Sequence, residues 1–398
     1  MTLAFLLTAA GGLAFLLLSP FSRTPLWRAT VTPLASIIGS GFLVSAPLLA
    51  REFGGFAAPA MALLIGVAAL IGWTIRYNIR VVEPELARGH DRLLASFEEL
   101  SHLALVFAYF ISVAYYLSLL GHFLLEAAGV QNGALANGIA IALVAGLGLL
   151  GWSGGAARVA SVERYATALN LSVIAGFLVA LAVFGLTRLR EGASVLPPPG
   201  HLSLGTLPVL LGLLIVVQGF ETTRFMGASF PAEIRIRAMR NAQAISAVVY
   251  IVFFLLLSPL FPELQKGDGV AAVISVSAAV AAILPLALTV AATGSQLSAS
   301  VADSIGDVGL IRELTHGKVD ARHAYVLIAV VGVGLLAATR VAGVIALASR
   351  AFALFYMLQC LVAWEAARKR PEDRRKSWAF LALAFTSGAV FLFGTSAG

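Results

Sequence analysis

Apolar residues in this chain fall into long runs that are separated by short polar segments. Runs of about 17 to 25 apolar residues are long enough to cross a lipid bilayer as α-helices. On this basis the sequence predicts about twelve membrane spans. They cover residues 3–19, 29–50, 56–77, 97–127, 134–152, 160–187, 206–230, 238–261, 270–302, 323–339, 341–367 and 377–394. A soluble protein would have to leave many of these runs without a polar face for water, so the pattern favours an all-α membrane protein.

The composition agrees with this fold class. Hydrophobic residues make up 60% of the 398 residues and charged residues 12%, whereas a typical soluble domain has about 25% charged residues. The single cysteine, Cys360, lies in an apolar run, so no disulfide can form within the chain.

The formal net charge of +7 comes from basic residues that gather in alternate loops. Basic residues are abundant around 23–28, 76–92, 158–164, 235–240, 312–322 and 368–376, and sparse in the loops between these. Loops rich in Lys and Arg stay in the cytoplasm. We therefore expect a protein of the plasma membrane, such as the bacterial inner membrane, with both termini extracytoplasmic. This distribution explains the basic charge without a nucleic-acid partner.

Two predicted spans contain interruptions near their middle. One has Gly39-Ser40-Gly41, and the other has Gln218-Gly219-Phe220-Glu221. Irregular backbone at membrane depth is tolerated where it lines a cavity, and paired interruptions in two halves of a chain indicate a transporter site. The alternative for the glycines is a close helix–helix contact between small residues.

Glu221 is the most informative single residue. A carboxylate at membrane depth is costly and marks a pathway, a proton relay or a buried ion pair. The structural alternative is an ion pair with Arg224, three residues later, or with Arg350. Two further acidic residues, Asp303 and Asp307, are expected at a cytoplasmic helix end, where they either pair with loop arginines or gate. Glu98 is expected at the cytoplasmic border, where it either reaches towards water or pairs with loop residues; the alternative is a proton relay.

The motifs Ile38-Gly39-Ser40-Gly41-Phe42 and Gln218-Gly219-Phe220-Glu221, with the basic segment that follows Pro231, resemble the amino acid–polyamine–organocation (APC) superfamily. The resemblance implies two inverted five-helix repeats with broken first and sixth core helices, preceded here by one extra helix. It divides the chain into an extra N-terminal transmembrane helix (1–22), a first repeat (23–190), a second repeat (200–370) and a C-terminal transmembrane helix (371–398).

The resemblance also implies a substrate site. A polar head group or carboxylate would lie at the backbone of Gly39, Ser40 and Gly41. The remaining substrate-binding residues implied are Tyr109, Ser112, Gln218, Gly219, Phe220 and Glu221.

An ion site is implied next to it. In sodium-coupled relatives a hydroxyl on core helix eight and carbonyls near Ala35 and Ile38 bind the ion. Ser295 is the hydroxyl that fits, with Thr293 or Ser298 as substitutes. Some proton-coupled relatives have a lysine on core helix five, where this sequence has Asn170 and Ser172, so the comparison leans towards Na⁺.

The resulting hypothesis is a secondary active transporter of a small polar solute, an amino acid or an amine, that works by alternating access and is coupled to Na⁺ or H⁺. The alternatives are an inorganic-ion transporter or channel-like protein on the same fold, and a membrane enzyme or sensor. The sequence has no Walker loop, His/Cys metal spacing or nucleophile elbow, so we expect no enzyme and no cofactor beyond the coupling ion. The expected partners are the solute and the lipid bilayer; the oligomeric state stays open.

Overall fold

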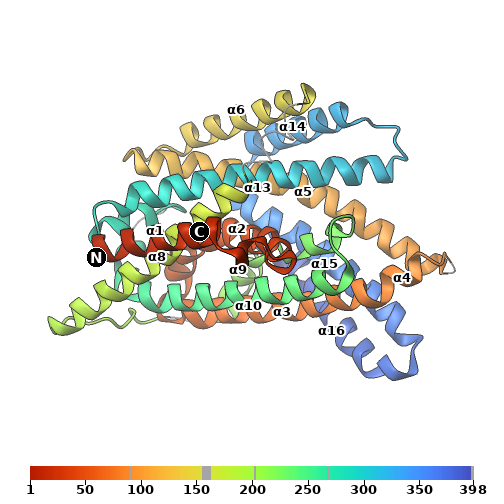
Figure 1. The fold of residues 1–398 in the computed structure, drawn as a ribbon, viewed down its shortest axis with the longest axis horizontal. Coiled ribbons are helices and arrows are strands. Elements are labelled where there is room, and N and C mark those ends of the chain that lie inside the picture. The colour runs from red at the N-terminus through yellow and green to blue at the C-terminus, as the bar shows by residue number, and fades with distance from the viewer. Residues whose placement is uncertain (90, 155–162, 201–202, 267–268, 396–398) are drawn as a thin grey trace.

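The computed structural model describes residues 1–89, 91–154, 163–200, 203–266 and 269–395. The described residues form helices and no strand. The long helices are α1 (Thr2–Leu18), α2 (Pro25–Phe53), α3 (Ala57–Tyr77), α5 (Arg92–Ala127), α6 (Gly133–Trp152), α8 (Glu163–Arg190), α10 (Ala232–Leu257), α13 (Leu284–Leu314), α14 (Ala321–Ala338), α15 (Val341–Arg368) and α16 (Arg374–Phe393). Most of them run along the longest axis of the molecule (Figure 1).

Short helical segments connect the long helices. The π-helix η3 (Asn78–Val82) and α4 (Glu83–Leu86) extend α3 at the end that carries the basic loops, and α11 (Phe261–Leu264) and α12 (Val273–Val276) lie between α10 and α13. The segment between α8 and α10 is divided into α9 (Leu207–Leu211), η5 (Leu214–Val217) and η6 (Phe220–Met226).

Length and composition identify membrane spans among the described residues. Eight helices are long and apolar enough to cross a bilayer, and α1 is a shorter apolar helix. Large apolar side chains face outward on several of them, among them Leu3 (69% exposed), Val248 (65%) and Phe385 (73%). Such exposure is expected where lipid replaces water as the surrounding medium. The prediction of an all-α integral membrane protein is confirmed.

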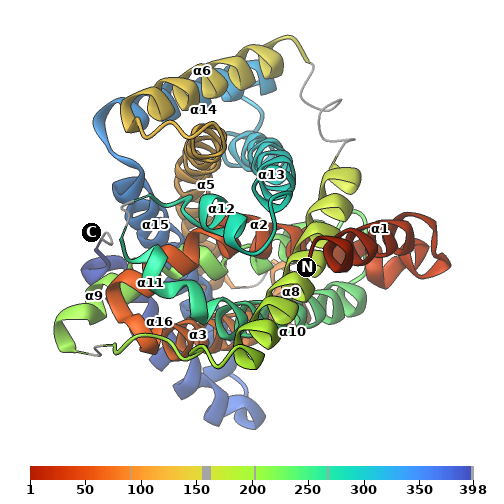
Figure 2. The ribbon, with the colours of Figure 1, turned by 90° about the vertical axis from the view of Figure 1, so that its left-hand side faces the viewer.

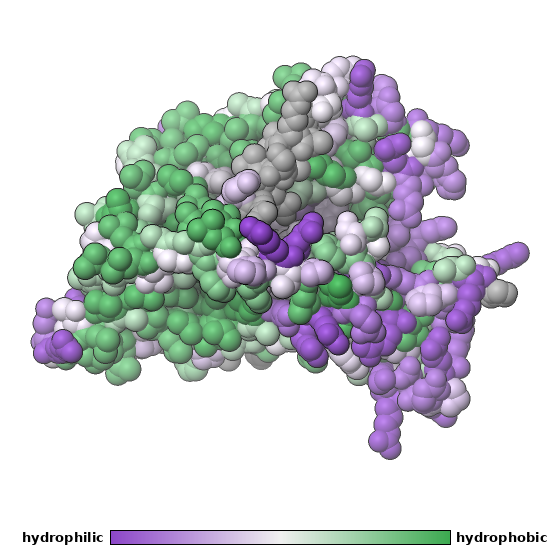
Figure 3. Space-filling model, in the orientation of Figure 1, coloured by the Kyte–Doolittle hydropathy of each residue, from purple (hydrophilic) through white to green (hydrophobic). Residues whose placement is uncertain are grey.

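The surface separates into an apolar part and a hydrophilic end. Hydrophilic residues gather at the end that carries α4 and the α13–α14 connection, and apolar residues cover most of the remaining visible surface (Figure 3). The N-terminus lies at the opposite end of the long axis (Figure 1). This separation is what the alternating loop charges require.

The packing brings corresponding helices of the two predicted repeats together. Contacts join α2 with η5 and η6, α3 with α10, α5 with α13, and α6 with α14. The end-on view shows α5 and α13 side by side inside the bundle (Figure 2). These contacts are consistent with the repeats, whose boundaries stay a prediction. The extra N-terminal helix is present as α1 and packs along α8.

Three predicted spans differ from the observed helices. The span predicted at 206–230 is divided into α9, η5 and η6. The span predicted at 270–302 begins later, because α13 starts at Leu284 and the residues before it form the short turns of α12 and η8 (Ser277–Ala279). An apolar run alone does not distinguish a helix from the packed turns that precede it. The first core helix, predicted as broken, is the continuous helix α2, for reasons given below.

Candidate functional site

The helix break at Gln218 and Gly219 is the centre of the site. Gln218 has an extended backbone (ψ 170°), and Gly219 has φ +117°. Only glycine adopts this φ without strain. A Cβ atom on Gly219 would lie 2.5 Å from the Ser36 hydroxyl of α2. The break predicted in this segment is therefore confirmed, and it presses directly against α2.

The glycines of α2 make close contacts instead of a break. A Cβ atom on Gly41 would lie 2.2 Å from the Val216 carbonyl oxygen, and one on Gly39 would lie 2.8 Å from the Ser295 hydroxyl. The prediction of a broken helix here is wrong, because the α-helix continues through both glycines. Gly41 makes room for the Val216 backbone and Gly39 for the Ser295 side chain. The side chain of Ser40 lies outside the described residues.

Side chains of other helices nevertheless reach the carbonyls of α2. The Tyr250 hydroxyl lies 3.0 Å from the Ile37 carbonyl oxygen and 2.7 Å from that of Val216. The Gln296 amide donates to the Gly39 carbonyl at 2.6 Å. Each carbonyl oxygen has two lone pairs, so this stretch of α2 accepts partners from outside the helix without unwinding.

Glu221 lies fully buried directly after the break. Its Oε2 accepts hydrogen bonds from the Gly219 N–H at 2.9 Å and from the Tyr356 hydroxyl at 2.8 Å. Its Oε1 has no hydrogen-bond partner among the described residues. A buried carboxylate oxygen without a partner is unfavourable, so this atom is the position where a solute or ion would gain most.

The aromatic residues around Glu221 come from α5 and α15. Phe220 stacks on Tyr356 with ring centroids 5.3 Å apart. The Gln218 amide donates to the Tyr116 hydroxyl at 2.9 Å. Tyr109 is buried within electrostatic range of Glu221, Asp303 and Asp307. The predicted residues Tyr109, Gln218, Gly219, Phe220 and Glu221 therefore lie in one region.

Arg224 pairs with Glu98 and not with Glu221. The guanidinium lies 2.5 Å from the Glu98 carboxylate, and its side chain is 3% exposed. Glu98 also accepts from Gln359 at 3.0 Å. Arg350 donates to the Phe391 carbonyl at 2.7 Å. Both ion pairs considered for Glu221 are thus replaced by other contacts, and Glu98 is a buried residue rather than a loop partner.

A small cavity lies between α2, α8 and α13. Its volume is about 30 Å³, enough for a water molecule or a monatomic ion. Of the predicted ion ligands, Ala35, Ser295 and Ser298 line it. The remaining lining residues are Thr32, Ser36, Thr167, Thr222, Ala299, Ala302 and Asp303.

The other predicted ion residues lie nearby. Ile38 and Ser295 line a second cavity of about 20 Å³. The Asn170 amide donates to the Ser295 hydroxyl at 3.2 Å, so helix α8 reaches this position with an amide. The Thr293 hydroxyl donates to the Thr289 carbonyl at 2.7 Å within its own helix, and Thr293 lines neither cavity.

Asp303 is the residue that the sequence did not place in the site. It lines the first cavity, and its carboxylate accepts a hydrogen bond from Ser112. Asp307, one turn further along α13, is fully buried, and both its carboxylate oxygens lack hydrogen-bond partners among the described residues. Asp307 therefore pairs with no loop arginine among the described residues, because it lies within α13 and its side chain is buried.

A signal for Asp303 exists in the sequence. Ser295, Ser298, Ala299, Ala302 and Asp303 follow the spacing of one helix face. All of them line the cavity. The periodic placement of small and polar residues in an otherwise apolar helix identifies this face. Tyr116 and Tyr356 have no comparable signal, because buried tyrosines are common on any packed helix.

This fold and site define a polytopic membrane transporter with a broken helix at its centre. Residues 19–394 match the sequence model of a family described as APC superfamily transporter. The chain is also 38% identical over 385 residues to an uncharacterized protein of Aquifex aeolicus (strain VF5). The matched region covers 95% of this chain and 93% of that protein. The chain therefore belongs to the APC superfamily of transporters, and the family match begins directly after α1.

Proposed function

We propose that the chain is a cation-coupled secondary transporter that moves an amine or an amino acid across the plasma membrane by alternating access. The observation that carries this proposal is the buried carboxylate of Glu221 at the helix break, one oxygen of which has no hydrogen-bond partner in the part of the chain that the structure describes. An intramembrane carboxylate in a transporter marks the path of a solute or an ion.

The contacts around the break favour a positively charged group on the solute. The Gly219 N–H is already taken by Glu221, and the N–H groups near Gly39 and Gly41 belong to a continuous helix. A solute carboxylate would find few free backbone donors in this arrangement. An ammonium group would instead meet the free Oε1 of Glu221 and could contact the faces of Phe220 and Tyr356. The amino group is therefore the part of the solute that we assign to Glu221.

The small cavity beside α13 is our candidate for the coupling ion. Hydroxyl, carbonyl and carboxylate oxygens are suitable ligands for Na⁺, and a carboxylate can equally take up a proton. Asp303 and Ser295 would hold the ion, and Thr222, one residue after Glu221, connects the cavity to the break. Occupation of the cavity would thereby favour one position of the broken segment.

The loop charges supply the orientation that we propose. The hydrophilic, basic end of the molecule faces the cytoplasm, and both termini are extracytoplasmic. A reporter that works only in the cytoplasm should therefore be inactive when it is fused to the C-terminus. Activity of this fusion would contradict the proposed orientation.

The test is uptake into proteoliposomes from a panel of labelled amines and amino acids, in Na⁺ or choline buffer and with or without a pH gradient. Glu221→Gln keeps the volume of the side chain and the contacts to Gly219 and Tyr356, so the variant should fold while uptake falls by at least about tenfold. Glu263→Gln, which removes an exposed carboxylate paired with Lys266, is the matched control and should transport normally. Full activity of a well-folded Glu221→Gln would contradict the proposal.

Transport of an inorganic cation is the second candidate, and the burial of Asp307 near Asp303 favours it. Two carboxylates one turn apart repel each other unless a proton or a cation lies between them. Uptake of a labelled metal cation in the absence of any organic solute, abolished by Asp307→Asn, would favour this function over the first.

A further inference from the structure

A cavity of about 230 Å³ lies between α3 and α10, and Glu221 is not among the residues that line it. Small residues form much of its wall, among them Ala68, Ala69, Ala244 and Ala247. Ala69 and Ala244 are exposed, so the cavity opens on the outer surface of the bundle. The absence of larger side chains at these positions produces a groove on a surface that faces lipid.

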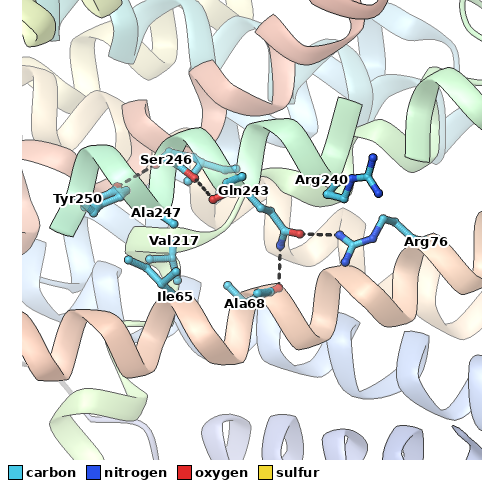
Figure 4. A pocket seen from close by; sticks show the side chains of 12 residues that line it. Ile65, Ala68, Arg76, Val217, Arg240, Gln243, Ser246, Ala247 and Tyr250 are labelled. Carbon is cyan, nitrogen blue, oxygen red and sulfur yellow. Dashed lines mark hydrogen bonds between the residues drawn. The ribbon is translucent and has the colours of Figure 1, made fainter. Parts of the chain in front are cut away.

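Two arginines lie at one end of this groove. Arg76 comes from α3 and Arg240 from α10, and both lie at the same end of the pocket (Figure 4). Arg76 donates to the Gln243 side chain at 2.7 Å, and Gln243 donates to the Ala68 carbonyl at 2.7 Å. In the described part of the chain neither arginine has a carboxylate partner. Two like charges without a counterion at the end of an apolar groove are unfavourable, and an anion between them would relieve this.

We propose that this groove binds an anionic phospholipid. The phosphate contacts Arg76 and Arg240, and the first part of an acyl chain lies along the alanine wall towards Ile65 and Tyr250. Guanidinium groups bind phosphate oxygens well. Arg76 lies one residue before the end of α3, which continues through η3 into α4 at the hydrophilic end of the molecule (Figures 1 and 3), where lipid head groups lie. A small soluble anion would leave the apolar part of the cavity unfilled, so a lipid satisfies both parts of the site.

The inner end of the groove reaches the helix break. Ile37, Val217 and Tyr250 line it there. The Tyr250 hydroxyl bridges the carbonyls of Ile37 and Val216. A bound acyl chain therefore packs against the residue that connects α2 to the broken segment. This inference concerns a site separate from Glu221 and stands whether or not the solute is an amine.

The test is native mass spectrometry of the detergent-purified protein with phosphatidylglycerol and phosphatidylcholine of identical acyl chains. The wild type should bind phosphatidylglycerol more tightly. Arg76→Gln and Arg240→Gln should each reduce this preference about fivefold, the effect of about 1 kcal/mol per basic residue near a lipid head group. Arg237→Gln, an exposed arginine on α10 outside the groove, is the matched control and should keep the preference.

Two further measurements separate a lipid from a free phosphate. Ala244→Phe fills the groove from an exposed position and should weaken both lipids, while glycerol 3-phosphate should bind weakly to every variant. Equal binding of the two lipids by the wild type, or an equal loss in Arg237→Gln and Arg240→Gln, would overturn the proposal. Glycerol 3-phosphate binding as tight as that of phosphatidylglycerol, unchanged by Ala244→Phe, would show a small-anion site and also overturn it.

Discussion

Gly39–Gly41 in α2 and Gln218–Glu221 in the segment before α10 are the two glycine-containing motifs of the site. The glycine of the second motif lies at a helix break, whereas the glycines of the first lie within a continuous helix. At Gly219 the chain has a positive φ, and the helix ends on one side and restarts on the other. At Gly41 the helix continues, and the missing side chain lets Val216 approach. Glycine permits a break but does not cause one. The break forms where Glu221 accepts the freed Gly219 N–H and Tyr356 holds the carboxylate.

The broken segment also carries two charges with separate partners. Glu221 contacts the backbone and a tyrosine, whereas Arg224, three residues later, is bound to Glu98 on α5. Proximity in sequence predicts a pair between Glu221 and Arg224. The 3₁₀ geometry of η6 and the position of α5 give Arg224 a different partner. Glu221 therefore has no arginine partner among the described residues.

The largest expected effect concerns this division of charges. Glu98→Gln leaves the buried Arg224 without its counterion and should lower the free energy of unfolding by about 3–5 kcal/mol. Glu221→Gln removes no ion pair and should lower it by no more than about 1 kcal/mol. Thermal melts of the two purified variants measure the difference. Equal stability of both variants would mean that water reaches Arg224. The carboxylates of Glu98 and Glu221 would then contribute equally to the free energy of unfolding.

A smaller effect tests the two roles of glycine. Gly41→Ala forces a Cβ atom against the backbone of Val216, and Gly219→Ala combines a contact with Ser36 with an unfavourable φ. Each should lower the free energy of unfolding by about 1–3 kcal/mol.

Gly66→Ala is the control for these two variants, since an added Cβ atom there meets no atom within 4 Å. It should leave the melting temperature unchanged or raise it slightly. A tolerated Gly41→Ala would indicate that α2 and the Val216 segment separate easily, which would weaken the contrast between the two glycine segments.

The smallest effect concerns the proposed ion cavity between α2, α8 and α13. Ser295→Ala removes a hydroxyl that lies against Gly39 and accepts from Asn170. If the cavity holds Na⁺, the variant should need about tenfold more Na⁺ for half-maximal uptake, with little change in solute affinity at saturating Na⁺. Ser300→Ala on the same helix is the control, because Ser300 donates to Leu297 within its own helix. Equal uptake in Na⁺ and choline by the wild type would contradict a sodium site.

The sequence by itself determined the fold class, the approximate positions of most helices and the family. These follow from apolar run length, and from short motifs such as Gly219-Phe220-Glu221, which are properties of neighbouring residues. It also singled out Glu221 as a candidate site residue, because a carboxylate is rare in an apolar run.

The tertiary structure decided which partner each polar group has. The continuity of α2, the pairing of Arg224 with Glu98 and the burial of Asp303 and Asp307 all depend on side chains from other helices. The groove between α3 and α10, with Arg76 and Arg240 at one end, also depends on residues that are distant in sequence. In an apolar medium a polar group has no water to bind, so its state is set by the nearest helix that offers a hydrogen bond or a counterion. That neighbour is distant in sequence and cannot be inferred from local spacing.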